Sequence, residues 1–291
     1  MWRNLPISLV ILLFATGARA QESPYVVTYD HHMEEPGGNL EVEASITTDV
    51  PRSGQRFYAA PYAEFEYGVT TRWTSELYLE SQSTWNDSTV FTGWRIENRF
   101  RPLKREHRIN PVLYLEYEQR SEASRIQKEI EGGAPDVTSP NSQLNLSKVH
   151  ELESKLILSS DVHDWNLAGN FIAAKNFSRN EGIEFGYSLG FSHPLRTLAS
   201  GSECHFCREN FSAGAEFYGG LGSTLDFGLK DTAHYAAPVI AWLVSDNVTL
   251  RFSPGIGLTR ESNPVLLRFG YSYEVKGLTT KLARLFGSSP R

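Results

Sequence analysis

Large apolar side chains stand at every second position through most of the chain, and small or polar residues fill the positions between them. In residues 183–192, for example, Ile183 and Phe185 alternate with Glu184 and Gly186. Successive side chains of a strand point to opposite faces, so this period of two predicts β-strands with one apolar face. Similar segments of roughly ten residues, separated by turn-forming residues, are typical of membrane barrel strands.

The alternation predicts about twelve strands. Their ranges are 40–47, 62–69, 73–80, 94–101, 113–118, 151–158, 165–173, 183–192, 211–221, 235–244, 248–258 and 265–275. Single-chain bacterial barrels have an even number of antiparallel strands, which puts both chain ends on the periplasmic side. We therefore expect an all-β protein, a single antiparallel up-and-down transmembrane β-barrel over residues 40–275.

The connections between these segments have the lengths that such a barrel requires, with short periplasmic turns and longer outer loops. Residues 68–71, 161–164 and 245–247 are predicted to be tight periplasmic turns. The longest irregular stretch, residues 121–145, falls on an outer link. Two predicted periplasmic links, residues 102–108 and 194–209, are longer than this rule prefers.

A soluble β-sandwich also alternates its faces and is the competing interpretation. Sandwich strands are typically about six residues long, whereas the segments here have the length needed to cross hydrocarbon at a tilt. Aromatic side chains such as Trp73, Trp165 and Tyr273 stand near strand ends, where the membrane–water boundary favours them. These two features favour the membrane barrel.

Residues 1–20 have the features of a secretory signal peptide. Arg3 supplies a positive start, residues 5–14 are nearly all apolar, and residues 18–20 form a small-x-small cleavage pattern. An uncleaved anchor is the alternative, but the apolar stretch is short for a membrane span. We expect cleavage and export.

Two short segments flank the predicted barrel, both on the periplasmic side. Residues 21–39 precede the first strand, and residues 276–291 form a tail after the last one. The tail places Leu278, Leu282 and Leu285 among basic residues, which predicts a short amphipathic helix.

The last predicted strand resembles the assembly signal of bacterial outer-membrane β-barrel proteins. That signal is a polar residue, any residue, glycine, two residues of any kind, and two aromatic or aliphatic residues one apart; Arg268, Gly270, Tyr273 and Val275 occupy its positions. The resemblance implies a transporter-like or porin-like protein in outer-membrane lipid, inserted by the barrel assembly machinery. The chain departs from the pattern because it continues beyond this strand, and it indicates no subfamily.

The composition changes this picture little. The 291 residues are 40% hydrophobic and their mean hydropathy is -0.35, which is too polar for a bundle of membrane-spanning helices. Residues 1–20 hold two arginines and no acid, so their removal takes the net charge from -6 to -8. We expect no nucleic-acid partner, because such binding needs clustered positive charge.

Charged side chains occupy the polar positions of the predicted strands and would face the barrel lumen. The residues expected to line it are Glu64, Glu66, Glu76, Arg95, Glu97, Arg99, Arg101, Glu116, Glu118, Glu151, Glu153, Arg251 and Arg268. Acids outnumber bases on this face, which favours cations in a water-filled lumen. The three arginines of residues 94–101 lie between acid-bearing strands, so we expect cross-strand ion pairs. These pairs could plug the lumen, stiffen the wall or orient a polar solute, or they could only satisfy one another.

Cys204 and Cys207 form a C-x-x-C pair in a predicted periplasmic link. A redox pair or half of a metal site is one interpretation. An oxidising periplasm favours a local disulfide instead.

His31, His32 and Met33, with flanking carboxylates, offer ligand types suited to copper or another transition metal. An exposed polar linker explains the same residues. We favour the linker, because neighbouring side chains on an extended chain point in opposite directions. The sequence therefore predicts no metal and no cofactor.

Three functions fit a barrel of this kind. We favour a channel or transporter for small polar or cationic solutes through the charged lumen. The alternative is a structural or adhesive envelope barrel that acts through its outer loops. An outer-membrane enzyme ranks last, and we expect no catalytic residues. The oligomeric state is open.

Overall fold

The computed structural model describes residues 23–34, 39–50, 56–125, 138–195, 207–279 and 281. Within these residues there are twelve β-strands and two short helical turns. The strands are β1 (Leu40–Asp49), β2 (Tyr58–Thr70), β3 (Trp73–Thr84), β4 (Thr89–Phe100), β5 (Asn110–Ser121), β6 (Lys148–Val162), β7 (Trp165–Asn176), β8 (Glu184–Pro194), β9 (Phe211–Ser223), β10 (His234–Ser245), β11 (Val248–Gly257) and β12 (Val265–Val275). The helical turns are α1 (Asn141–Leu144) and the 3-10 turn η1 (Arg208–Asn210). Every predicted strand is present, and the twelve-strand prediction is confirmed.

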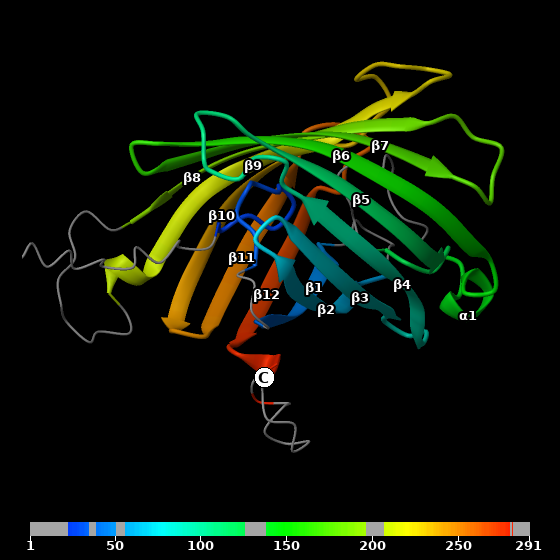
Figure 1. Ribbon diagram of the computed structural model, residues 1–291. Helices are drawn as coiled ribbons and strands as arrows, with labels where there is room; N and C mark the ends of the chain where they lie inside the picture. Colours follow the sequence, from blue (N-terminus) through cyan, green and yellow to red (C-terminus); the bar gives the residue numbers. More distant parts are fainter. Residues whose placement is uncertain are drawn as a thin grey trace, which may run out of the picture.

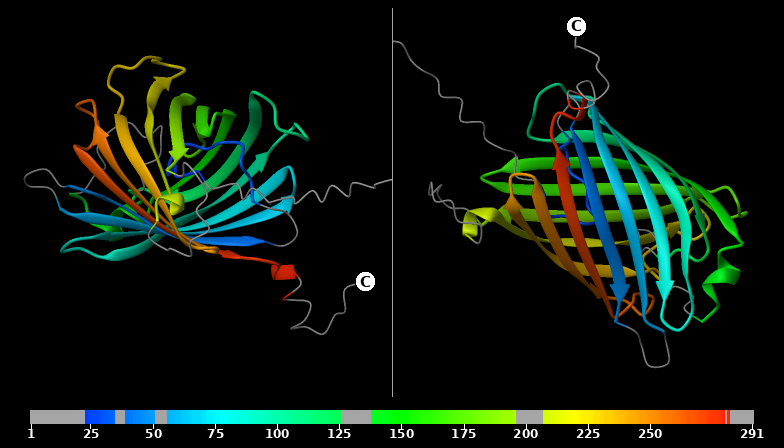
Figure 2. Two further views of the ribbon diagram at one scale, coloured as in Figure 1. Left: turned by 90° about the vertical axis from the view of Figure 1, so that its left-hand side faces the viewer. Right: turned by 90° about the horizontal axis from the view of Figure 1, so that it is seen from below.

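The strands close into a barrel (Figures 1 and 2). Each strand pairs with its neighbour in the chain, and β1 pairs antiparallel with β12, where Ala44 lies opposite Tyr271. Closure removes the two free edges of the sheet, so the backbone groups of the wall are paired with one another. The predicted up-and-down antiparallel barrel is confirmed.

The two ends of the barrel differ in their connections. We call the end where β1 begins and β12 ends the terminal end, and the opposite one the loop end. Tight turns at residues 71–72, 163–164 and 246–247 lie at the terminal end. His163 (φ 52°) and Asp164 (φ 66°) both have left-handed backbone conformations, which a two-residue hairpin turn of the favoured type requires. The longest connection, between β5 and β6, lies at the loop end and contains α1.

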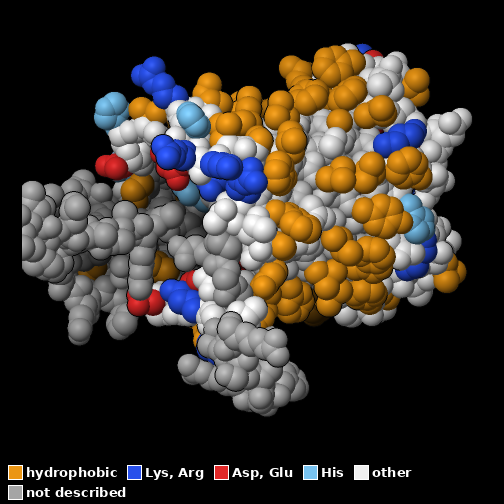
Figure 3. Space-filling view, in the orientation of Figure 1, with side chains coloured by type: hydrophobic (Ala, Val, Ile, Leu, Met, Phe, Trp, Pro, Cys, Tyr) orange, Lys and Arg blue, Asp and Glu red, His pale blue; other side chains and the backbone are white. Residues whose placement is uncertain are grey.

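The outer surface of the wall is apolar. Leucine, isoleucine and phenylalanine side chains of the predicted apolar parity, such as Leu77, Ile96, Leu115, Phe171 and Leu189, are exposed. Figure 3 shows hydrophobic side chains spread over this face of the wall. Such a surface is matched by acyl chains rather than by water. Among the described residues, no helix is both long and apolar enough to cross a membrane.

The interior of the barrel is polar and closely filled. Glu97, Glu116 and Glu118 are among its fully buried side chains, together with Tyr218 and Tyr235. β10 is apolar on both faces, so its sequence does not show which face points into the lumen. In the structure Tyr235, Ala237 and Val239 are buried inside the barrel, and Ile240 is exposed. Over most of their length the strands therefore place polar side chains inside and aliphatic side chains outside. In β4 the alternation shifts at Gly93, where the pairing with β3 changes register.

Candidate functional site

Seven glutamates lie directly opposite one another across seven neighbouring strands, and we call them the glutamate row. In order from β12 through β1 to β6 they are Glu274, Glu41, Glu66, Glu76, Glu97, Glu116 and Glu153. Like charges directly opposite one another destabilise a sheet. The lumen-facing side chains of β12 and β1–β6, which we call the charged half-wall, therefore need cations close by.

Two arginines of β4 pair with five acids of the charged half-wall. Arg99 bonds to Glu66 through Nη2 at 2.5 Å and also to Glu76, and its Nε lies 3.3 Å from Oε1 of Glu97. Arg95 bonds to Oε1 of Glu80 and Oε2 of Glu116, each at 2.9 Å. The cross-strand ion pairs predicted for this strand are therefore present.

Three further cations pair with acids of the charged half-wall. Lys155 Nζ lies 3.2 Å from Glu153, Arg120 Nε lies 2.8 Å from Glu118, and Arg251 Nη1 lies 2.5 Å from Glu43. Two other acids expected in the lumen, Glu64 and Glu151, are half-buried and buried respectively. Glu64 lies with Glu66 and Glu76 in a cluster whose oxygen atoms are within 4.8 Å of one another.

The remaining basic residues predicted to line the lumen lie apart from this network. Arg101 follows the end of β4, and its Nη2 donates to the backbone oxygen of Thr71 at 3.2 Å, at the rim of the terminal end. Arg268 is buried inside the barrel and bonds to the hydroxyl of Tyr218.

The opposite side of the lumen is built from smaller side chains. In β7–β10, Ala168, Gly190, Glu216 and Ala237 lie directly opposite one another in register. We call the lumen-facing side chains of β7–β10 the small half-wall. Its small residues leave room that the chain itself fills.

Residues 23–34, which we call the inner segment, occupy that room. The dark blue loop that precedes β1 lies inside the ring of strands (Figure 2). Backbone N–H groups of Val26, Val27 and Thr28 donate to the buried carboxylate of Glu216, with shortest distances of 3.2, 2.8 and 2.6 Å. Successive N–H groups that converge on one anion form a strong anion-binding arrangement. Glu216 is thus the principal anchor of the inner segment.

Tyr29 joins the two half-walls. Its backbone N–H donates to Oδ1 of Asn170 and its carbonyl accepts from Nδ2 of the same side chain, both at 2.8 Å. Its hydroxyl donates to Glu97 Oε2 at 2.9 Å, across the lumen. Nearer the terminal end, the hydroxyl of Tyr25 donates to the carbonyl of Asn166 at 3.0 Å.

A cluster of two histidines and an aspartate ends the buried part of the inner segment. His31 Nε2 lies 3.6 Å and His32 Nε2 lies 3.3 Å from Oδ2 of Asp161, which is near the end of β6. The expectation of an exposed polar linker is wrong here, because Asp30 and His31 are buried. The chain bends at His31, so the two rings face the same side instead of opposite sides.

The protonation states of this cluster follow from its carboxylates. Burial lowers the pKa of His32, but Asp30 and Asp161 outweigh it and raise the pKa to about 10. Burial lowers the pKa of His31, and the positive charge of His32 lowers it further. Burial raises the pKa of Asp30, but His32 holds it below its usual value. Without a metal, the cluster therefore contains one charged and one neutral imidazole.

A serine and a histidine meet in this cluster, as an enzyme would require. Ser159 Oγ lies 2.6 Å from His31 Nδ1, and both residues are buried. In serine hydrolases the serine bonds to Nε2 and the aspartate to Nδ1. Here the serine bonds to Nδ1, and Asp161 lies 3.6 Å from Nε2, so the arrangement differs from that triad.

The residues of the assembly signal lie along β12. Arg268 faces inwards, whereas Tyr273 is exposed on the outer surface. A Cβ at Gly270 would lie 3.0 Å from Ser45 Oγ and 3.1 Å from Glu43 Oε1, so glycine leaves room for these lumen groups. Val275 is the last residue of β12. Recognition by the assembly machinery stays a prediction.

Other predictions fall partly outside the described residues. Cys207 is disulfide-bonded, while Cys204, the only other cysteine of the chain, lies outside them. Residues 1–20 and most of the tail also lie outside.

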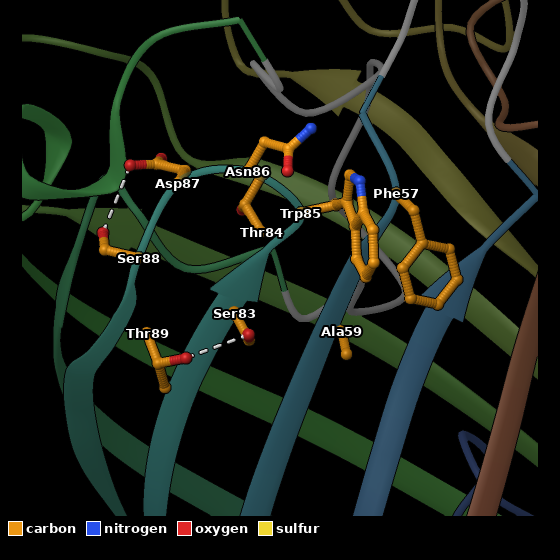
Figure 4. Close-up of a pocket in the computed structure, with 9 residues that line it drawn as sticks. All are labelled: Phe57, Ala59, Ser83, Thr84, Trp85, Asn86, Asp87, Ser88 and Thr89. Atoms are coloured by element: carbon orange, nitrogen blue, oxygen red, sulfur yellow. Dashed lines mark hydrogen bonds between the residues drawn. The ribbon is translucent and has the colours of Figure 1, made fainter.

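A cavity of about 260 Å³ opens at the loop end, next to the β3–β4 turn (Figure 4). Phe57 and Trp85 form one side of it, and Asp87 and Ser88 line the other. The backbone N–H of Asn141 in α1 donates to Asp87 Oδ2 at 2.7 Å. The start of α1 is thus tied to this turn.

Comparison with solved structures gives similar barrels at low sequence identity. The KdgM porin is 8% identical, with 81% of this chain and 98% of that chain covered and a TM-score of 0.49. The NanC porin is 10% identical, with 81% and 100% covered and a TM-score of 0.49. The translocator domain of the autotransporter NalP from Neisseria meningitidis is 12% identical, with 82% and 89% covered and a TM-score of 0.42. No protein-family model matches the sequence, and no curated protein matches it.

The inner segment is the part of the site that the strand pattern did not predict. Tyr25, Val26, Val27 and Tyr29 form a short apolar run, which is unusual in an exposed linker. That run was the one feature of the sequence that indicated burial of this segment. Its destination, Glu216, could not be identified, because the partner lies 189 residues from Val27.

Proposed function

We propose that this protein is an outer-membrane channel for small polar or cationic solutes, closed in this structure by its own inner segment. The observation that carries the proposal is the docking of the inner segment against Glu216 and Asn170, inside a barrel that closes without it. The location and the insertion route, outer-membrane lipid and the barrel assembly machinery, belong to the same proposal.

The closed state is supported by the burial of lumen side chains on both half-walls. Glu97, Glu116 and Glu216 each have 0% of their surface exposed. Carboxylates that face a water-filled pore would be exposed instead. The inner segment and the ion pairs together exclude water from this level of the lumen.

The opening step in this proposal is withdrawal of the inner segment, because residues 23–34 contain no strand and are not part of the wall. The segment is held in the lumen by hydrogen bonds and packing. Its departure would uncover the alanine and glycine positions of the small half-wall and leave the strand pairing unchanged. A path for solutes would then run along the small half-wall.

The preference for cations follows from the acids that such a path would expose. Glu216 would lose the three backbone N–H groups that now compensate it. The glutamate row lies on the facing side of the lumen and exceeds its arginine and lysine partners in number. Carboxylate rings favour cations in channels.

The test is planar-bilayer recording of the full mature chain and of a variant lacking residues 24–33. We expect little conductance from the mature chain and open, cation-selective channels from the variant, with selectivity measured by the reversal potential in a salt gradient. A deletion of residues 282–291, which has the same length, is the matched control and should behave like the mature chain.

Two outcomes would contradict the proposal. If the variant lacking residues 24–33 inserts as a folded barrel but carries no current and passes no solute into liposomes, the protein is not a channel. If it conducts with anion selectivity, the proposed class of solute is wrong.

A further inference from the structure

We propose that His31, His32 and Asp161 form a binding site for a divalent transition-metal ion, with Zn²⁺ as the ion that fits best, and that the bound ion fastens the inner segment to the barrel wall. The site lies at the terminal end, where β6 meets its turn to β7. The inference concerns metal binding and holds whether or not the lumen conducts.

The spacing of the donor atoms fits a tetrahedral ion. One ligand atom from each of the three residues lies within 4.8 Å of the other two. Ligands about 2.0–2.2 Å from Zn²⁺ in tetrahedral geometry lie roughly 3.3–3.6 Å apart. The distances from Asp161 Oδ2 to the two imidazole Nε2 atoms, 3.3 and 3.6 Å, have this length.

The other atom of each proposed ligand is already held by a neighbour. His31 Nδ1 bonds to Ser159 Oγ at 2.6 Å, and His32 Nδ1 bonds to Asp30 Oδ2 at 3.0 Å. Histidine ligands of metals are usually oriented in this way, with the second ring nitrogen donating to a carboxylate or another acceptor. These bonds leave both Nε2 atoms directed at one point.

Asp161 is oriented in the same manner. Its Oδ1 accepts from Nδ2 of Asn166 at 2.7 Å, which turns Oδ2 towards the histidines. The site therefore has three ligands, each with a hydrogen-bonded neighbour behind it.

One ligand atom lacks a partner where it stands. His31 has 0% of its surface exposed, and within the described part of the chain its Nε2 makes no hydrogen bond. The 3.6 Å to Asp161 Oδ2 is too long for one. A buried polar atom without a partner destabilises a fold, and a metal ion would satisfy the lone pair of this nitrogen.

The site is also open to solvent on one side. The side chains of His32 and Asp161 are 30% and 42% exposed. An ion can therefore enter from the terminal end, and water can supply a fourth ligand. Binding would release the proton now held by His32, because a ligating imidazole is neutral.

The test is equilibrium dialysis of the untagged, folded full chain in detergent against Zn²⁺, with Co²⁺ as a spectroscopic substitute. We expect one ion per chain and the strong visible bands of tetrahedral Co²⁺. Asp161→Asn and His32→Ala should weaken binding at least 100-fold. Ser159→Ala should weaken it about 10-fold, because Ser159 only positions His31. His163 is an exposed histidine of the neighbouring turn. His163→Asn, in which asparagine tolerates the same left-handed backbone conformation, should leave binding unchanged.

The inference is overturned if the chain binds no Zn²⁺, or if Asp161→Asn binds it as tightly as the unchanged chain. An equal loss in His163→Asn would show adventitious binding. Folding of each variant is checked by the gel shift of the heated against the unheated barrel, so that a misfolded variant is not counted. If the full chain binds Zn²⁺ but the folded variant lacking residues 24–33 carries no current, the channel is refuted and this site is left in place.

Discussion

The charged half-wall and the small half-wall fill the same lumen by different means. On the charged half-wall, long side chains reach across the space, and Arg95 and Arg99 tie acids of neighbouring strands together. On the small half-wall, alanine and glycine side chains take up little of the lumen, and the inner segment fills the remaining space. The ion pairs of the charged half-wall therefore belong to the strands, whereas the small half-wall is filled by residues 23–34, which are not part of any strand.

This difference separates the stability of the wall from the docking of the inner segment. A buried ion pair that loses one partner leaves an uncompensated charge, which is strongly destabilising. A docked segment that loses one contact is held more weakly, and the strand pairing of the wall is unchanged. Variants of the two half-walls should therefore affect different measurements.

The largest effect is expected on the charged half-wall. Arg99→Met leaves Glu66, Glu76 and Glu97 without their shared cation, so the free energy of unfolding should fall by about 3–5 kcal/mol. Urea unfolding in lipid vesicles measures it. Arg105→Ala is the control, at an exposed arginine of the β4–β5 connection, and should change the free energy of unfolding little. An Arg99→Met barrel as stable as the unchanged protein would refute the structural role of this network.

The next effect belongs to the anchor of the inner segment. Glu216→Gln removes the charge that accepts three backbone N–H groups, and docking of the segment should weaken by about 2–3 kcal/mol. Hydrogen exchange at residues 26–28 should become faster while exchange in the strands stays slow. Glu184→Gln, at an exposed glutamate of β8, should leave this exchange unchanged, and strand exchange that rises equally would show that Glu216 supports the wall.

A smaller effect is expected from bulk alone. A Cβ at Gly190 would lie 2.7 Å from Cε1 of Tyr25, so Gly190→Ala should displace the inner segment at a cost of about 1–3 kcal/mol. The added conductance in planar bilayers measures it. Gly169→Ala is the matched control, because its Cβ would meet only Leu189 Cδ2, at 3.4 Å. Equal conductance from both variants would contradict the tight fit at Gly190.

The smallest effect concerns the link between the half-walls. Tyr29→Phe removes the hydrogen bond to Glu97 and should weaken docking by about 1 kcal/mol, read as faster exchange of the amides of the inner segment. Tyr273→Phe, on the outer surface, should have no effect on that exchange. No change in Tyr29→Phe would mean that the charged half-wall does not hold the segment.

The wall of the barrel could be predicted from the sequence, because side-chain alternation is a local property. Leu115 and Glu116 face opposite sides whatever their neighbours are. Strand number, closure and the tight turns followed from that alternation. The glutamate row could be predicted only in part. The sequence of each strand shows which positions are acidic, but it does not give the register that places Glu76 opposite Glu97.

The contents of the small half-wall could not be predicted in the same way. The inner segment has no period, and its partners are distant in sequence. The prediction for His31 and His32 assumed an extended chain, and one bend at His31 reversed it. Short segments without regular structure take their shape from the cavity that receives them, which exists only after the strands have assembled.

The pairing of β1 with β12 has a consequence for the order of biogenesis. The inner segment is synthesised before all twelve strands, and its acceptor Glu216 emerges 189 residues after Val27. The seam between the first and last strands joins only after β12 has been made. Contacts between such distant residues form late in folding. The inner segment must therefore stay undocked until Glu216 has been made. It then enters the lumen as the barrel closes between β1 and β12.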